Sequence, residues 1–271
     1  MGEKNWGCFK QAAVGCGCLV VLAVAVPIVL GVMVMLPLNR AVDSRTELED
    51  RHGTQDAFVP PATGVPSPDR IEAFLKVRQA LTATCDDFWN AERAIAKMEA
   101  FDDQEEVSKI AVMKQAMSTS KTMMGMGPLI GHFYEARNQA LVDQDMGLGE
   151  YTYIYVLAYN DEIVSPTEKL ELFGPSATNL RVRQALQSML GNQLELLRLE
   201  GGPADTLAAV AIEVEALEED PKRIPWQDGL PPEITASLLP YRSELDRLFC
   251  GSTPPLELMI NEKRGLAIES R

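Results

Sequence analysis

Hydrophobic side chains form one long uninterrupted run near the N-terminus. No charged residue lies between Ala12 and Leu38. As an α-helix these 27 residues would extend about 40 Å, whereas the hydrocarbon core of a bilayer is about 30 Å thick. The run is too long for a cleaved signal peptide, and it does not end in the small residues of a cleavage site. The sequence therefore predicts an uncleaved transmembrane helix at 12–38, within an N-terminal segment 1–38.

The next residues, 39–66, are first charged and then rich in proline. The charged part, 39–53, predicts a helical stalk. The stretch that follows, TQDAFVPPATGVPSP, contains four prolines and a glycine, which favour extended backbone and are typical of a linker. A domain boundary is therefore expected near Ser67.

After Ser67, apolar residues recur at three- and four-residue spacing, which predicts an all-α fold with about six helices in a bundle at 67–253. Ser67-Pro68-Asp69 has the residue types of a helix start, and the apolar spacing continues to Met98. The run YTYIYVLAY at 151–159 also suits a strand, but its glycine-bounded helical neighbours favour a helix. Glycine and proline positions place further helices at about 103–124, 128–142, 150–159, 177–199, 204–219 and 233–249, the last kinked by Pro240. The tail 254–271 has no clear period, and LELMI within it suits a short strand or a docking segment.

Charge excludes several classes of partner. The chain has a net charge of −14, so nucleic acid is not expected to bind. Only two histidines, His52 and His132, are present, which excludes zinc sites built from several histidines. The sequence points to no cofactor.

The basic residues that flank the predicted span are nearly even in number on its two sides. A large domain can cross a membrane largely regardless of its charge. We therefore expect the N-terminal tail inside the cell and the helical domain outside the cytoplasm, in the cell envelope.

Small residues lie at the start of the predicted span. Ala13 and Gly17 are four positions apart, a spacing that lets transmembrane helices approach closely. Nearby Cys16 and Cys18 lack the fourth ligand of a structural zinc site. This face of small residues predicts close packing between transmembrane helices and therefore a homo-oligomer.

Cys85 and Cys250 lie outside the predicted span. In an oxidising compartment they could form a disulfide. Reduced, they would act as small buried hydrophobic residues. The sequence leaves both interpretations open.

Two groups of residues suggest chemistry. A methionine-rich stretch provides soft thioether ligands that suit Cu(I), although adaptable core packing has the same signature. His132 and Glu135, on one helical face, could act as an acid–base pair, although a surface hydrogen bond is the commoner outcome. The residues of the copper hypothesis are Met113, Met117, Met123, Met124 and Met126.

Tyr151, Tyr155 and Tyr159 follow i,i+4 spacing and would share one face of a helix. Tyrosine is enriched at protein interfaces because its ring is apolar and its tip polar. The same spacing also suits core packing. We therefore expect first a membrane-anchored module that binds or scaffolds an unknown protein partner, second a Cu(I)-binding bundle, and third an enzyme that uses His132 and Glu135.

Overall fold

A computed structural model describes residues 39–102, 127–164, 175–220 and 222–258. These residues form helices joined by turns, without a strand among them, which confirms the all-α prediction. The described helices are 39–52, η1 (Gln55–Ala57), α2 (Pro68–Ala80), α3 (Thr82–Asp102), 127–143, α5 (Leu148–Ala158), α6 (Asn160–Val164), α7 (Pro175–Glu200), α8 (Ala204–Glu219), α9 (Pro232–Leu238), η2 (Leu239–Tyr241), α10 (Arg242–Leu248) and α11 (Pro254–Glu257).

None of the helices in these ranges is both long and apolar enough to cross a bilayer. The predicted span at 12–38 lies outside the described residues, as do the predicted helix at about 103–124 and the tail beyond Leu258.

Helix α5 is the centre of the core. Every residue from Leu148 to Ala158 except Glu150 is buried. A helix that is hydrophobic on all sides must be surrounded by other elements, and α5 contacts α2, α6, α7 and η1. The aromatic run is therefore a helix, as predicted, and not a strand.

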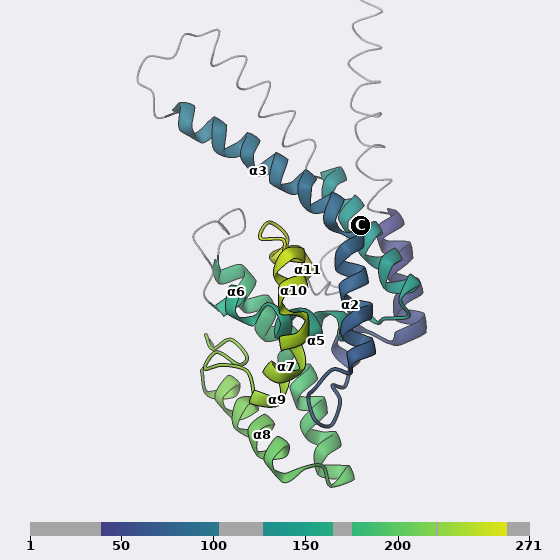
Figure 1. Ribbon diagram of the computed structural model, residues 1–271, viewed down its shortest axis with the longest axis vertical. Coiled ribbons are helices and arrows are strands. Elements are labelled where there is room, and N and C mark those ends of the chain that lie inside the picture. The colour runs from purple at the N-terminus through teal and green to yellow at the C-terminus, as the bar shows by residue number, and fades with distance from the viewer. Residues whose placement is uncertain (1–38, 103–126, 165–174, 221, 259–271) are drawn as a thin grey trace, which may run out of the picture.

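Two of the predicted helices are divided, so the described residues contain more than the six helices expected. The first breaks at Leu81, which is buried and separates α2 from α3, and the chain changes direction there (Figure 1). The last becomes α9, η2 and α10 because Pro240 lies in the 3₁₀ turn between them. Ser67 does begin α2, but its side chain makes no capping bond, and its carbonyl oxygen accepts from the Arg70 and Ile71 amides instead.

The helix at 39–52, predicted as a stalk, lies against the helix at 127–143. Leu48 is buried in the core. The Asn138 side-chain amide donates to the carbonyl oxygen of Ala41 at 3.2 Å and to the hydroxyl of Ser44 at 3.1 Å.

The proline-rich segment that follows also contacts the helical core. The buried Gln55 side chain donates to the Thr152 hydroxyl at 2.9 Å, and the Tyr153 hydroxyl donates to the Gly64 carbonyl oxygen at 2.7 Å. Contacts therefore cross the predicted boundary near Ser67. The Gly64 contact forms because carbonyl groups of a proline-rich loop can accept from neighbouring side chains as readily as from water.

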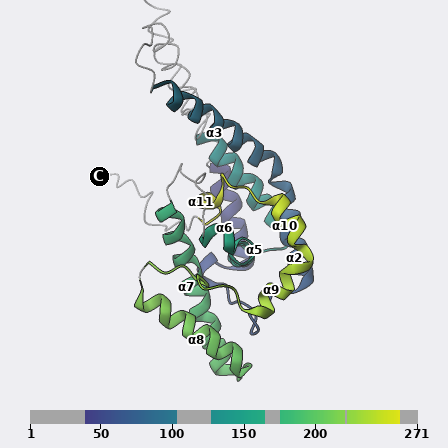
Figure 2. The ribbon, with the colours of Figure 1, turned by 60° about the vertical axis from the view of Figure 1, so that its left-hand side comes forward.

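The described helices form an elongated molecule (Figures 1 and 2). Helix α3 extends toward one end, and the hairpin of α7 and α8 forms the opposite end. Helix α7 also contacts α5, α6, η1 and α11, so it connects the core to this hairpin.

Gly149 tests how closely η1 packs on α5. A Cβ added at Gly149 would overlap the Cβ of Phe58 and lie 2.5 Å from the Gln55 carbonyl oxygen. Gly149→Ala is therefore expected to lower the free energy of unfolding by about 1–3 kcal/mol, the usual cost of overpacking. Gly191→Ala on α7 is the control, because a Cβ there meets nothing within 4 Å and alanine stabilises a helix interior by about 0.5–1 kcal/mol. Equal urea midpoints for the two variants would contradict the packing.

Candidate functional site

The His132–Glu135 pair lies on the surface. The His132 Nδ1 and Glu135 Oε2 atoms are 3.7 Å apart, and the His132 side chain is 60% exposed. Arg40 Nη1 lies 3.8 Å from the other Glu135 oxygen. This is a solvated surface pair, an environment unlike the enclosed sites in which acid–base pairs work.

Several predicted sites fall outside the described residues. These are the copper-ligand methionines, namely Met113, Met117, Met123, Met124 and Met126, and the small-residue pair Ala13 and Gly17. The copper and oligomer hypotheses remain predictions.

The structure contains the disulfide between Cys85 and Cys250, whose Cα atoms are 5.9 Å apart. It joins the first turn of α3 to the segment after α10, 165 positions along the chain.

The tyrosine face belongs to the core. Tyr151, Tyr155 and Tyr159 are at most 1% exposed, and their rings follow one another at centroid distances of 6.1 and 5.0 Å. Of the two interpretations that the sequence leaves open for these residues, the structure supports core packing over an interface, because the i,i+4 face of α5 packs against other elements.

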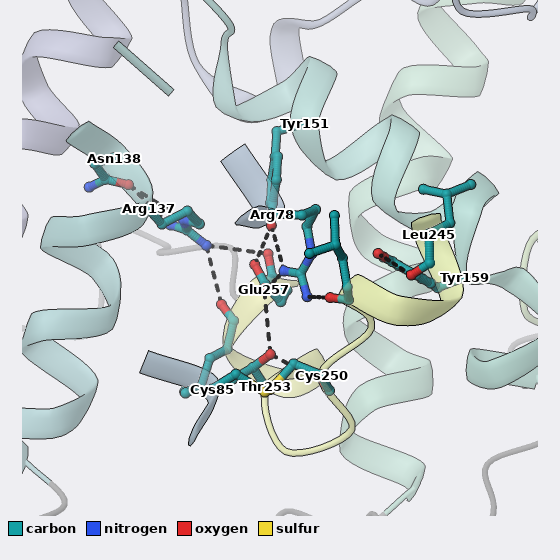
Figure 3. A network of polar contacts seen from close by, with 12 residues as sticks. Arg78, Cys85, Arg137, Asn138, Tyr151, Tyr159, Leu245, Cys250, Thr253 and Glu257 are labelled. Atoms are coloured by element: carbon teal, nitrogen blue, oxygen red, sulfur yellow. Dashed lines mark hydrogen bonds and ion pairs between the residues drawn. A yellow bond between two sulfur atoms is a disulfide. The ribbon is translucent and has the colours of Figure 1, made fainter. Parts of the chain in front are cut away.

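A network of buried polar groups lies beside the tyrosines and the disulfide (Figure 3). Arg78 on α2 and Glu257 on α11 form an ion pair whose side chains are 1% and 0% exposed. The Tyr151 hydroxyl donates to Glu257 Oε2 at 2.8 Å. Arg78 Nη2 donates to the Leu248 carbonyl oxygen at 3.0 Å, and its guanidinium lies 5.3 Å from the centre of the Tyr155 ring.

Other contacts hold the backbone around Glu257. Arg137 donates to the carbonyl oxygens of Leu256 and Glu257, both at 3.4 Å. Thr253 donates to the Cys250 carbonyl oxygen at 3.3 Å. The network is closed to solvent, so its chemistry is structural: it fastens residues 250–258 to α2, α5 and the helix at 127–143.

Burial raises the pKa of the hydroxyls of Tyr151, Tyr153, Tyr155 and Tyr159 above the usual tyrosine value of about 10. Below about pH 10 both the folded and the unfolded chain keep these protons, so the contribution of these tyrosines to stability is fully present. Above it the unfolded chain loses protons that the folded chain retains, so stability falls as pH rises.

We therefore expect alkaline unfolding above about pH 10. Tyrosinate absorbance from the buried residues should rise together with the loss of helical circular dichroism. Ionisation of all four tyrosines with unchanged helix content would contradict this.

A cavity of about 560 Å³ lies between α7, α8 and the loops packed on them. Its walls come from 63–65, from Tyr153 and Gln193, from the start of α8 (203–210), and from 226–234. We call it the Trp226 cavity. Its volume is within the range of small-ligand sites.

Two residues of the cavity lining each carry a buried polar atom that lacks a hydrogen-bond partner among the described residues: Oε1 of Gln193 and Nε1 of Trp226. Gln193 is 0% exposed and Trp226 is 6% exposed. Buried polar groups are nearly always paired, and an unpaired one typically costs about 1–3 kcal/mol.

The backbone of Trp226 is strained. Its φ is +58°, a left-handed conformation that costs a bulky residue about 1–2 kcal/mol. The buried carboxylate of Glu213 accepts from the Trp226 amide at 2.9 Å, and Arg223 lies 2.9 Å from the other Glu213 oxygen. The surroundings thus hold Trp226 in place, and strain of this kind is frequent at functional sites.

The charged residues of the cavity lining are both acidic. Asp205 and Glu233 are exposed and lie in the first turns of α8 and α9. No histidine, cysteine, serine or lysine is among the lining residues. Sequence reasoning missed this site because its walls come from five separate segments, and the left-handed Trp226 carries no residue-type signal.

Comparisons of the chain with known protein families, with curated proteins and with solved structures find no match.

Proposed function

We propose that this chain is a single-pass membrane protein whose helical domain is a binding module of the cell envelope, with the Trp226 cavity as its ligand site. The observation that carries the proposal is the cavity itself, about 560 Å³ in volume and bordered by α7 and α8, beside a Trp226 residue held in the left-handed conformation.

Binding is favoured over catalysis by the residues that line the cavity. They contain neither a histidine nor a cysteine nucleophile. What they provide is apolar walls with a few polar groups, among them two threonines and two carboxylates, which are the parts of a recognition site.

The disulfide supports placing the domain outside the cytoplasm, because disulfides persist in oxidising compartments. Residues 12–38 would be the membrane anchor. A cysteine in place of the exposed Ala208 should react with a membrane-impermeant maleimide in intact cells. Reaction only after lysis would reverse the orientation.

Site-specific photo-cross-linking tests the binding function in the full chain. A benzophenone side chain in place of Thr206, which lines the cavity, should form a discrete adduct in living cells. The same side chain at Ala208, two positions away and outside the lining, should not form that adduct.

A second variant tests whether formation of the adduct depends on the cavity. Ala209→Trp fills the cavity from α8 and should abolish the Thr206 adduct, while Ala208→Trp should leave it unchanged. An adduct that is equally strong with either substitution, or no adduct from Thr206, would contradict the proposed function.

A further inference from the structure

We infer that residues 222–231 are a movable wall of the Trp226 cavity and that the buried carboxylate of Glu213 holds this wall closed. The wall lies between α8 and α9, and it contributes Trp226 and Pro231 to the cavity lining. The inference concerns the regulation of the proposed ligand site and rests on that proposal for its biological role. The movement itself can be measured without a ligand.

Few polar contacts attach the wall to the rest of the described chain. Apart from bonds at its two ends, they go to two side chains. Glu213 Oε1 accepts from Arg223 Nε at 3.2 Å and from the Trp226 amide at 2.9 Å, and Oε2 accepts from Arg223 Nη2 at 2.9 Å. Asn160 Nδ2 donates to the Pro225 carbonyl oxygen at 3.4 Å. The Glu213 side chain is 6% exposed, so its charge is poorly screened and its three bonds are the main polar attachment.

Other hydrogen bonds of the wall lie within it. The Gln227 amide donates to the Ile224 carbonyl oxygen at 3.1 Å, and the Gly229 amide donates to the Trp226 carbonyl oxygen at 2.9 Å. The Ile224 amide donates back to Gln227 Oε1 at 3.3 Å. These bonds do not depend on α8 or on the core. The wall can therefore keep its own shape while it moves away from Glu213.

The closed position has two costs, and both fall on Trp226. Its backbone is left-handed, with φ at +58°, and its buried Nε1–H group has no acceptor among the described residues. Outward movement would let the backbone relax and let water accept from the indole. Burial of Ile224 and Trp226, at 5% and 6% exposed, opposes this movement together with the Glu213 bonds. Because the costs offset part of the attachment, an open state lies close to the closed one in free energy.

A ligand in the cavity would act on this balance. Trp226 lines the cavity only while the wall is closed, so a ligand that contacts Trp226 binds the closed state better than the open one. Ligand binding and closure of the wall are therefore coupled, by as much as the ligand's affinity differs between the two states.

Hydrogen–deuterium exchange of the full chain in a neutral detergent, read by mass spectrometry, tests the movement. Peptides from the wall should exchange faster than the slowest amides of the core, because they open without global unfolding. Gly149→Ala, which destabilises the core, should speed exchange of those core amides and leave the wall unchanged. A wall that exchanges at the rate of the core, or that follows the core in Gly149→Ala, would overturn the inference.

Glu213→Gln tests what holds the wall closed. The substitution keeps the shape of the side chain and removes the charge that Arg223 and the Trp226 amide contact, so exchange in the wall should rise about tenfold. Glu215→Gln is the matched control, because Glu215 lies on the same helix and is exposed. Equal exchange of the wall in the two variants would remove Glu213 from this role.

Gly229→Ala provides a variant that leaves Glu213 intact. Gly229 has a φ of +111°, and a Cβ there meets nothing within 4 Å, so alanine strains the closed backbone without a clash. Exchange in the wall should again rise. Gly53→Ala, at a φ of +78° with equally open surroundings but outside the wall, should leave the wall unchanged. The same wall exchange in both alanine variants would contradict a closed state held in this backbone conformation.

Cross-linking from Thr206 separates this inference from the binding function. If the wall opens ahead of the core but no adduct forms, the movement stands and the binding function fails. If the adduct forms while the wall opens only with the core, the cavity binds its ligand with a fixed wall and this inference fails. If neither is observed, both fail.

Discussion

Glu257→Gln is expected to lower the free energy of unfolding by about 3–5 kcal/mol, the cost of removing one partner of a buried ion pair. The substitution keeps the size of the side chain and removes its charge. Arg78 then remains protonated and enclosed, with a side chain that is 1% exposed. Arg78 also donates to the Leu248 carbonyl oxygen and to the Tyr151 hydroxyl. Both acceptors are neutral, so they do not replace the charge of the carboxylate.

Glu150→Gln is the matched control. Arg70 and Glu150 form an ion pair with two hydrogen bonds, Nε and Oε1 being 2.6 Å apart, but their side chains are 32% and 19% exposed. Water screens this pair, so its loss is expected to cost no more than about 1 kcal/mol. Urea unfolding in a neutral detergent, followed by circular dichroism, compares the two variants.

A double variant separates the effect of pairing the two charges from the effect of burying them. Replacing Arg78 by methionine and Glu257 by leucine removes both charges, and it is expected to cost less than Glu257→Gln alone. If Glu257→Gln were no more harmful than Glu150→Gln, the carboxylate would not be compensating Arg78 in the folded chain.

Loss of the disulfide is expected to have a comparable effect. Cys85→Ala with Cys250→Ala should lower the free energy of unfolding by about 2–5 kcal/mol, because the bond restricts a long loop in the unfolded chain. The cysteines are 165 positions apart, a separation at the upper end of this entropy effect. Both cysteines are replaced together so that no unpaired thiol remains.

Reduction provides the control for this variant. A reductant should destabilise the wild-type chain to the level of the double variant and leave the double variant unchanged. A wild-type chain that is equally stable in oxidising and reducing buffer would contradict the role of the bond.

Local patterns predicted the helices but not how they pair. The starts of α2 and α8 and the end of α7 follow from proline, glycine and apolar spacing. The break at Leu81 has no such signal, because the apolar period continues through it and only packing divides the helix. Likewise, the i,i+4 tyrosines indicate one helical face, but whether that face is covered depends on helices distant in sequence.

The buried ion pair, the state of the cysteines and the cavity could not be predicted from the sequence for a related reason. Arg78 and Glu257 are 179 positions apart. The local sequence around each of them predicts an ordinary charged residue in contact with solvent. The cysteine pair could be identified because few cysteines are present, but its state could not. The Trp226 cavity requires loops that composition marks as linkers, since glycine and proline indicate a turn without indicating what the turn packs against.

The Cys85–Cys250 bond makes residues 85–250 a covalent ring. A protease that cuts the backbone once inside this ring opens it without releasing a fragment. Everything after the cut, including α11, stays attached through Cys250 to Cys85 and so to the N-terminal residues. If those residues are embedded in a bilayer, a nicked molecule remains at the membrane until a reductant frees its distal half.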